Sequence, residues 1–265
     1  MLDITKIKLG KLAAKHDPRS LQMAKYTSTL PAPPPSLDWT KGVTEWGMML
    51  NDSLGDCTCA AIGHGAQVVT LNVPIGEVTP PDILILNLYE HACGYVPGNP
   101  NTDQGGVILD VLNYVQKNAL GRRRRVGGGH HKKFPLLAFT EVNYKDKVQV
   151  EQAIQCFAVV DIGLQLPITA QAQVGKVWEV VGNPIADPNS QPGSWGGHSV
   201  IVPKYDVDGP TCITWGQLQK MTWGFWNTYV DESYALFYRF WLDQFGGQYS
   251  EMLSQLEADL KTITG

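Results

Sequence analysis

Charged side chains and long hydrophobic runs are both scarce in this chain of 265 residues. Asp, Glu, Lys and Arg make up 17% of it, against roughly 25% in soluble domains. The net charge of −4 argues against a general polyanion-binding role. The apolar run 157–166 is interrupted by Asp161 and is far shorter than the roughly 20 residues of a transmembrane helix. We therefore expect no nucleic-acid partner and no membrane segment.

Cysteine is sparse as well, with five residues at irregular spacing. An odd number without a regular pattern argues against a disulfide framework and for a reducing compartment. The N-terminus has no apolar segment typical of a secretory signal, so we expect a cytoplasmic protein. Cys57 and Cys59 lack a second ligand pair at zinc-site spacing. The sequence thus predicts no metal site, and nothing in it points to a cofactor.

Glycine and proline are abundant, at 27 and 17 residues, which disfavours a helical bundle. The patterns that follow one another along the chain are helical first and extended later, which is typical of an α+β fold. We expect helices over 57–72, 79–92, 106–119, 145–155, 232–245 and 251–262. We expect strands over 158–166, 176–181, 198–205 and 211–215, with an aromatic strand or turn over 220–230.

These elements suggest four segments. Residues 1–36 form an N-terminal extension that ends in a proline-rich connector, expected to lie as a strap over the surface, with an inhibitory propeptide as the alternative. Residues 37–135 form a helical lobe, 136–230 a β-rich lobe, and 231–265 a C-terminal helical extension. The segment 122–133 carries four Arg and two Lys, and we expect a solvated loop there.

Two short segments carry the candidate chemistry. Gly55 permits a tight turn that places Cys57 at a helix N-terminus, where the helix dipole favours a thiolate. Asn51 precedes it and is a candidate hydrogen-bond donor to an oxyanion. His198 follows two glycines at the start of an apolar strand, roughly 140 residues after Cys57. This separation resembles that of papain-type cysteine proteases, in which the catalytic cysteine and histidine lie roughly 130–150 residues apart.

Four pieces of the chain, in order over about residues 31–217, resemble the papain-like cysteine protease family. They are the run 37–44 (LDWTKGVT) with Asn51 and Cys57, the run 103–106 (DQGG), the run 197–200 (GHSV), and the run 214–216 (TWG). The resemblance implies a two-lobed α+β fold, with a helical lobe, an antiparallel β-barrel-like lobe and an active-site cleft between them. It also implies a thiol hydrolase that cleaves peptide or protein substrates.

The resemblance assigns roles to individual residues. Cys57 is the nucleophile, His198 the base and then the acid, and Asn51 the oxyanion donor where the family usually has Gln. Gly105 and Gly106 line the substrate cleft. Trp215 shields His198 from water.

Three positions depart from the family pattern. Ile213 stands where the triad Asn is expected, and an aliphatic side chain cannot orient His198. Thr58 replaces the aromatic residue that follows the nucleophile. Asp103 stands where a disulfide cysteine is expected, which fits a cytoplasmic bacterial or viral relative.

Other interpretations stay open at this point. Cys59 competes with Cys57 as the nucleophile, although it lies about 200° around the helix. A backbone carbonyl or another side chain can replace the missing Asn. Two further functions compete with a peptidase: an inactive papain-fold binding or scaffold protein, and a thiol-dependent acyl or amide transferase.

Overall fold

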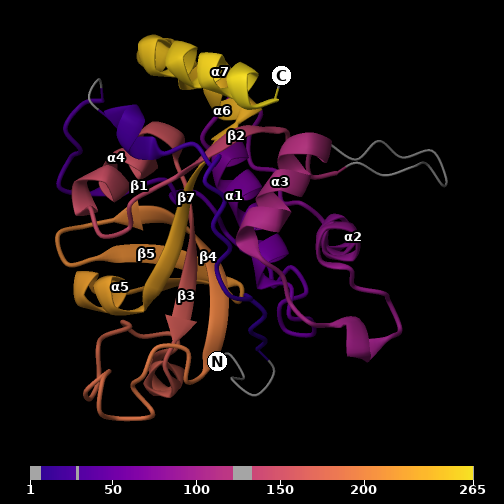
Figure 1. The fold of residues 1–265 in the computed structure, drawn as a ribbon, viewed down its shortest axis with the longest axis vertical. Coiled ribbons are helices and arrows are strands. Elements are labelled where there is room, and N and C mark those ends of the chain that lie inside the picture. Colours follow the sequence, from indigo (N-terminus) through magenta and orange to yellow (C-terminus); the bar gives the residue numbers. More distant parts are fainter. Residues whose placement is uncertain (1–6, 28–29, 122–132, 265) are drawn as a thin grey trace.

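The computed structural model describes residues 7–27, 30–121 and 133–264. One antiparallel sheet forms the centre of the molecule, and helices pack on both of its faces (Figure 1). The basic segment 122–132, for which the sequence predicts a loop, lies outside the described residues. None of the helices in the described ranges is both long and apolar enough to cross a membrane.

Three helices cover one face of the sheet. They are α1 (Cys57–Leu71), α2 (Asp82–Cys93) and α3 (Ile108–Asn118). Their apolar side chains form one core cluster with Ile201, Ile213 and Leu236 of the sheet. All three helices were predicted, although the second begins after the prolines rather than at Thr79, with Pro81 at its N-cap.

The sheet runs in the order β2-β7-β3-β4-β5-β6, and the short β1 pairs with β4. The predicted α+β class is confirmed, but the sheet is open, because the path ends at β2 and β6 without closing into a barrel. The strands are β1 (Leu37–Asp38), β2 (Leu136–Glu141), β3 (Val160–Leu166), β4 (Gly196–Tyr205), β5 (Pro210–Thr214), β6 (Gln217–Lys220) and β7 (Val230–Tyr238).

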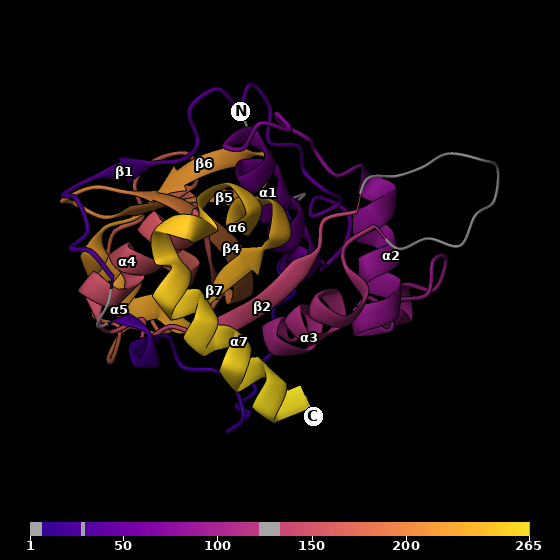
Figure 2. The same cartoon turned by 90° about the horizontal axis from the view of Figure 1, so that it is seen from above.

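The opposite face carries a second core cluster, built around β3 and the helix α4 (Lys147–Phe157). Two helices close the chain, α6 (Arg239–Phe245) and α7 (Ser250–Thr264), and Figure 2 shows α7 lying across the top of the molecule. The short 3₁₀ helices are Met23–Lys25, Pro100–Thr102, Ile168–Gln173 and Gly246–Tyr249.

Three predicted elements are wrong. Residues 176–181 are irregular apart from one isolated bridge between Trp178 and Met221. The aromatic segment 220–230 contains the helix α5 (Trp223–Tyr229), whose first turn is capped by the Thr222 hydroxyl. The predicted helix over 232–245 is a strand up to Tyr238 and a helix only from Arg239.

The strand β7 escaped detection because its alternation changes phase. Glu232 pairs with Gly163, but the next residue of β3, Leu164, pairs with Val230, so Asp231 is an extra residue in a β-bulge. Val230 therefore joins the same core cluster as Phe237, although regular alternation puts them on opposite faces. As a consequence, the β-rich part of the chain extends through Tyr238, beyond the expected boundary at 230.

Small residues let α1 approach the sheet closely. A Cβ atom added at Gly65 would lie 2.9 Å from the Tyr238 hydroxyl and 3.4 Å from Ile201 Cδ1. Tyr238 is fully buried, and its hydroxyl donates to the Ile62 carbonyl of α1 at 3.0 Å. The tyrosine cannot move aside without losing this bond.

We predict that Gly65→Ala destabilises the protein by about 1–3 kcal/mol through overpacking. Alanine is normally the better helix former by about 1 kcal/mol. A decrease in the free energy of unfolding on Gly65→Ala would therefore indicate the close contact. Gly224→Ala, at an exposed position of α5, is the matched control, since the nearest atom to an added Cβ lies at 3.6 Å. Urea unfolding measures both changes, and equal stabilisation of the two variants would contradict the prediction.

Candidate active site

Cys57 is the first residue of α1, as the sequence predicted. The turn before it is held from the helical side, because Asp103 Oδ1 accepts the Gly55 N–H at 2.9 Å. The same oxygen accepts the Tyr89 hydroxyl at 2.7 Å, and that hydroxyl accepts the Gly105 N–H at 2.9 Å. One carboxylate thus ties the nucleophile turn to the predicted substrate-binding glycines.

The thiol of Cys57 is 1% exposed. Burial raises its pKa to about 12, while hydrogen bonding from the backbone of Ser199 and of Gly10 acts in the opposite direction. Burial also raises the pKa of the neighbouring Asp56 well above its usual range. Burial thus favours the neutral carboxylic acid of Asp56 over the negative charge that the sequence places beside Cys57.

His198 lies on β4, next to Ser199, and its ring is fixed on two sides. Its Nε2 lies 2.7 Å from Thr214 Oγ1. One ring face stacks on Trp215, with centroids 4.5 Å apart and planes 16° apart. Its Nδ1 is buried and has no hydrogen-bond partner within the described residues. Burial lowers the pKa of His198 to about 3, so the ring is neutral in this state.

The Thr214 hydroxyl lies beside His198 Nε2, where the sequence shows Ile213 in place of the expected orienting Asn. Ile213 is buried in the core beneath α1, on the opposite face of β5 from Thr214, since side chains alternate along a strand. The Thr214 hydroxyl is thus the candidate for the substituting side chain that the sequence left open. It lies in the run 214–216, where the resemblance assigned it no role.

Asn51 lies at the end of a strained turn. Met49 and Leu50 have φ values of 51° and 70°, a region that side-chain-bearing residues rarely adopt. The Asn51 side chain is 3% exposed and donates to the Leu54 carbonyl at 3.2 Å. Its amide is therefore held in place close to the turn that leads to Cys57.

Cys59, the competing nucleophile, lies elsewhere. It is fully buried, and its Sγ lies 4.0 Å from Cys93 Sγ within the helical side. Burial raises the pKa of Cys59 well above its usual range.

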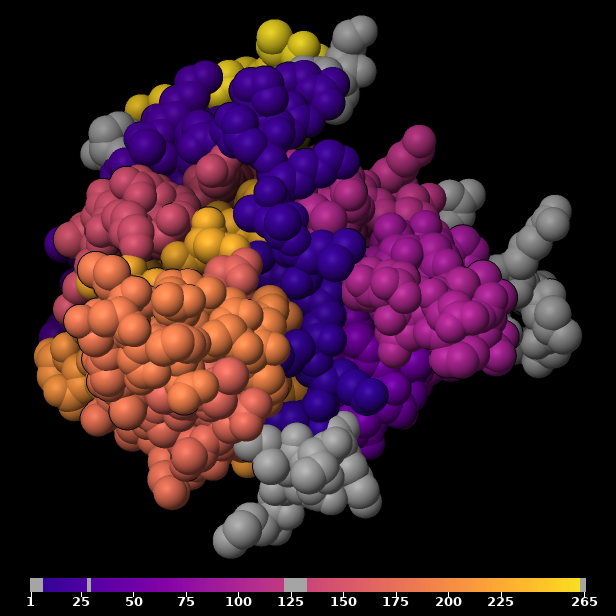
Figure 3. All heavy atoms as spheres, turned by 60° about the horizontal axis from the view of Figure 1, so that its bottom comes forward, coloured from indigo at the N-terminus to yellow at the C-terminus, as the bar shows by residue number. Residues whose placement is uncertain are grey.

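Residues 7–12, which we call the N-terminal strap, run along the seam between the helical side and the sheet. Figure 3 shows this indigo segment between the orange and the magenta halves of the surface. From the helical side, the Gly106 N–H donates to the Gly10 carbonyl at 2.8 Å, and the Gly106 carbonyl accepts the Leu12 N–H at 2.9 Å. From the sheet, Gly197 O accepts the Lys11 N–H at 3.0 Å.

The strap fits because three backbones come into contact. A Cβ atom at Gly10 would collide with the carbonyl oxygen of Gly55, and one at Gly105 would collide with the carbonyl oxygen of Gly10. The Trp215 indole donates to the Lys8 carbonyl at 3.2 Å. The N-terminal segment is thus inserted between the predicted site residues, rather than laid over the outer surface.

Sequence reasoning missed Thr214, Tyr89 and the strap residues Gly10 and Lys11. Gly10 and Lys11 contact partners up to 220 positions away, and no local pattern marks such contacts. Asp103 was noted only as a missing cysteine, although an acidic residue two positions before a glycine pair was a readable signal.

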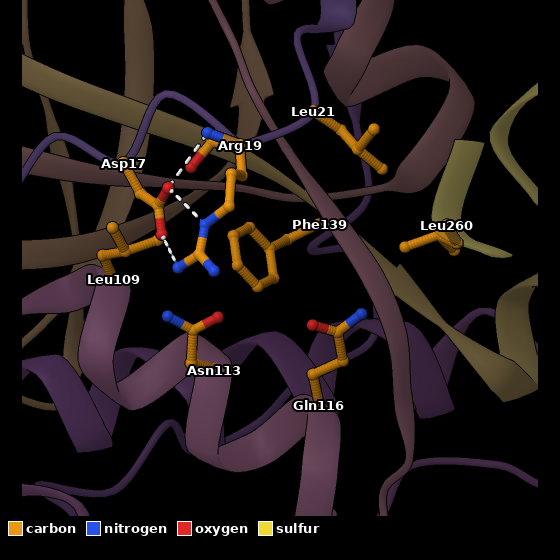
Figure 4. Close-up of a pocket in the computed structure, with 9 residues that line it drawn as sticks. Asp17, Arg19, Leu21, Leu109, Asn113, Gln116, Phe139 and Leu260 are labelled. Carbon is orange, nitrogen blue, oxygen red and sulfur yellow. Dashed lines mark hydrogen bonds and ion pairs between the residues drawn. The ribbon is translucent and has the colours of Figure 1, made fainter. Parts of the chain in front are cut away.

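Other parts of the described structure do not compete with this site. In the described ranges, no group of three or more His, Cys, Asp or Glu could hold a metal ion. Figure 4 shows a surface pocket of about 220 Å³ beside α3, lined by residues that include Phe139 and the Asp17–Arg19 ion pair. None of the predicted site residues lines it.

No family model matches the chain, and no curated protein matches it. Solved structures do. Xylellain, a cysteine protease from Xylella fastidiosa, is 15% identical, with 88% of this chain and 96% of that chain covered and a TM-score of 0.61. Digestive procathepsin L 3 of Tenebrio molitor larval midgut is 13% identical, with 88% and 77% covered and a TM-score of 0.56. A Carica candamarcensis cysteine protease, in complex with E-64, is 15% identical, with 77% and 98% covered and a TM-score of 0.53.

These neighbours are papain-like cysteine proteases. The chain therefore has the papain-like two-lobed fold, and the resemblance seen in the four sequence pieces is confirmed at the level of the fold.

We predict that Cys57 reacts slowly with iodoacetamide in the folded full-length chain. At a pKa of about 12, only about one thiol in ten thousand is ionised at pH 8, and the strap covers it. Gly10→Val adds a side chain that the seam cannot hold, so it displaces the strap and speeds labelling at least tenfold, an order-of-magnitude expectation. Peptide mapping after timed labelling measures the rate, with Gly224→Val as the control. Labelling of the unaltered chain at the rate of a free thiol would contradict this state of the site.

Proposed function

We propose that the protein is a cysteine peptidase whose N-terminal strap keeps the site covered. The observation that carries the proposal is the placement of Cys57 at the N-terminus of α1, beside the strand that holds His198 between Thr214 and Trp215. One nitrogen of His198 is used by Thr214, and the buried Nδ1 has no hydrogen-bond partner in the part of the chain that the structure describes. An unpaired buried nitrogen is costly, and a proton-transfer role accounts for it.

In the proposed reaction, the Cys57 thiol transfers its proton to His198 Nδ1, and the sulfur attacks the carbonyl carbon of a peptide bond. The oxyanion lies at the N-terminus of α1, where the backbone N–H of Cys57 and the Asn51 amide stabilise it. His198 then gives the proton to the leaving amine. Water, deprotonated by His198, hydrolyses the thioester and regenerates the thiol.

The covered site is poorly suited to this chemistry, and that supports latency. A neutral thiol and a neutral imidazole follow from complete burial of both groups. Departure of the strap admits water, which stabilises the thiolate and the imidazolium. A peptide substrate would then occupy the seam that residues 7–12 now fill.

The argument for an inactive scaffold depended on Ile213. The Thr214 hydroxyl, 2.7 Å from His198 Nε2, supports the peptidase over that alternative. No contact among the described residues favours an amine acceptor over water, so a transferase has no specific support. The cytoplasmic location remains a prediction.

We expect the full-length Gly10→Val variant to hydrolyse a fluorogenic pool of random peptides faster than the unaltered chain does. Cys57→Ala or His198→Ala in that background lowers the rate by at least about a thousandfold, because the nucleophile and its base act as a unit. Cys59→Ala is the matched control and retains activity. Release of fluorophore over time measures the rates. Equal activity of the Cys57→Ala and Cys59→Ala variants would contradict the proposal.

We expect Thr214→Val, in the same background, to lower kcat by roughly ten- to a hundredfold while KM changes little. Valine keeps the shape and removes the hydroxyl that accepts from Nε2 when the ring is charged. The pKa of His198 in the open site then falls, so the alkaline limb of the kcat/KM profile moves to lower pH. Thr214→Ser keeps the hydroxyl and should retain both rate and profile. Indistinguishable profiles for the Val and Ser variants would show that Thr214 only packs.

A further inference from the structure

Lys11 is the most deeply buried part of the strap. Its side chain is fully buried, and its Nζ lies 2.9 Å from Asp231 Oδ2 and 3.0 Å from Glu232 Oε1. Nζ also donates to the Leu12 carbonyl, at 3.3 Å. A buried ammonium is strongly unfavourable unless it is paired, so this pocket is built around a positive charge.

The β-bulge in β7 explains how two consecutive residues reach one atom. Successive side chains of a regular strand point to opposite faces, but Asp231 is the extra residue between Val230 and Glu232. Its carboxylate and that of Glu232 therefore converge on the same Nζ.

The pocket is shaped for a long side chain. Gly163 of β3 forms its floor, since a Cβ there would collide with Lys11 Cε and lie 2.6 Å from Asp231 Oδ1. Gln165 donates to Asp231 Oδ2, and the Tyr234 hydroxyl donates to Glu232 Oε2 at 3.1 Å. Both carboxylates are thus held in position from the protein body, independently of the strap.

The pocket opens beside the candidate catalytic residues. Gly10, the neighbour of Lys11, contacts the Cys57 thiol through its backbone. The stretch with Lys11 and Leu12 lies along Gly106, whereas Lys8 lies at Trp215, which stacks on His198. Because His198 protonates the leaving amine, the Lys11 side corresponds to the acyl half of a bound peptide.

We propose that this acidic pocket, formed by Gly163, Gln165, Asp231 and Glu232, selects a Lys or Arg side chain of the substrate at the residue before the one that acylates Cys57. The proposal rests on the peptidase function above for its catalytic consequence. Lys11 fills the pocket as a substitute for that side chain. Because Lys11 follows Gly10, whereas the selected residue precedes the acylating one, the strap runs in the direction opposite to a substrate. The substrate class is a peptide with a basic residue one position before the cleaved residue, and acidic residues there are rejected.

The test uses the full-length chain with Gly10→Val and Lys11→Ala, which frees both the seam and the pocket. Substrates are the coumarin amides of Leu-Xaa-Gly, with Xaa as Lys, Arg, Met or Glu. Glycine stands next to the fluorophore because Gly10 lies at Cys57. We expect kcat/KM for Lys and Arg to exceed that for Met by at least about tenfold, as expected for a charge-assisted hydrogen bond.

Adding Asp231→Asn and Glu232→Gln should abolish this preference, while Asp110→Asn on the exposed face of α3 should preserve it. In the Lys11→Ala background no lysine is left buried without its partners, which protects folding. The single Asp231→Asn is the second variant, since its side chain is partly exposed, and it should reduce the preference several-fold.

A binding measurement separates the pocket from the chemistry. A fluorescent peptide with the sequence of residues 7–14 is titrated onto the same chain carrying Cys57→Ala, against the same peptide with Met in place of its lysine. A Lys preference in binding without cleavage of any substrate supports the pocket and overturns the peptidase proposal. Cleavage without a Lys or Arg preference overturns the pocket and leaves the peptidase standing. Binding of neither peptide overturns the pocket.

Discussion

The close packing of α1 on the sheet is the constraint on which the site depends. Glycine and alanine along the helix let its axis lie near β4 and β7, and Tyr238 fixes the depth of the contact through the Ile62 carbonyl. That packing places Cys57, at the helix N-terminus, against the backbone of Ser199. Cys57 lies on the helical side and His198 on the sheet, so larger side chains along α1 would move the two residues apart without altering either of them.

The N-terminal strap completes the same interface. It is held by backbone hydrogen bonds from both sides, by glycine contacts too close for any side chain, and by the ion pairs of the buried Lys11 with Asp231 and Glu232. Burial of Cys57 and His198 follows from it, and their shifted pKa values follow from that burial. In the proposed peptidase, the segment that excludes peptides also excludes the water that would stabilise a charged thiolate and imidazolium, so the strap blocks substrate binding and lowers thiol reactivity at the same time.

Much of this could be predicted from the sequence, and the failures have definite causes. Cys57, His198 and Trp215 lie in short local motifs whose spacing carries information, and the helices follow their apolar periodicity. Thr214 was missed by one position because the alignment of a motif does not show which face of a strand a side chain occupies. Lys11 was missed because its partners lie about 220 residues away along the chain. The strand β7 was missed because an inserted residue interrupts its alternation.

The inserted residue, Asp231, affects which mutations strand β7 can accept. Asp231 is extra to the ladder, so its loss would leave Glu232 paired with Gly163 and Val230 with Leu164, as they already are. An in-frame deletion of one codon would thus remove a carboxylate from the pocket while making the sheet more regular. In this chain, loss of the second acidic group is thus a single genetic step that keeps the flanking strand pairs.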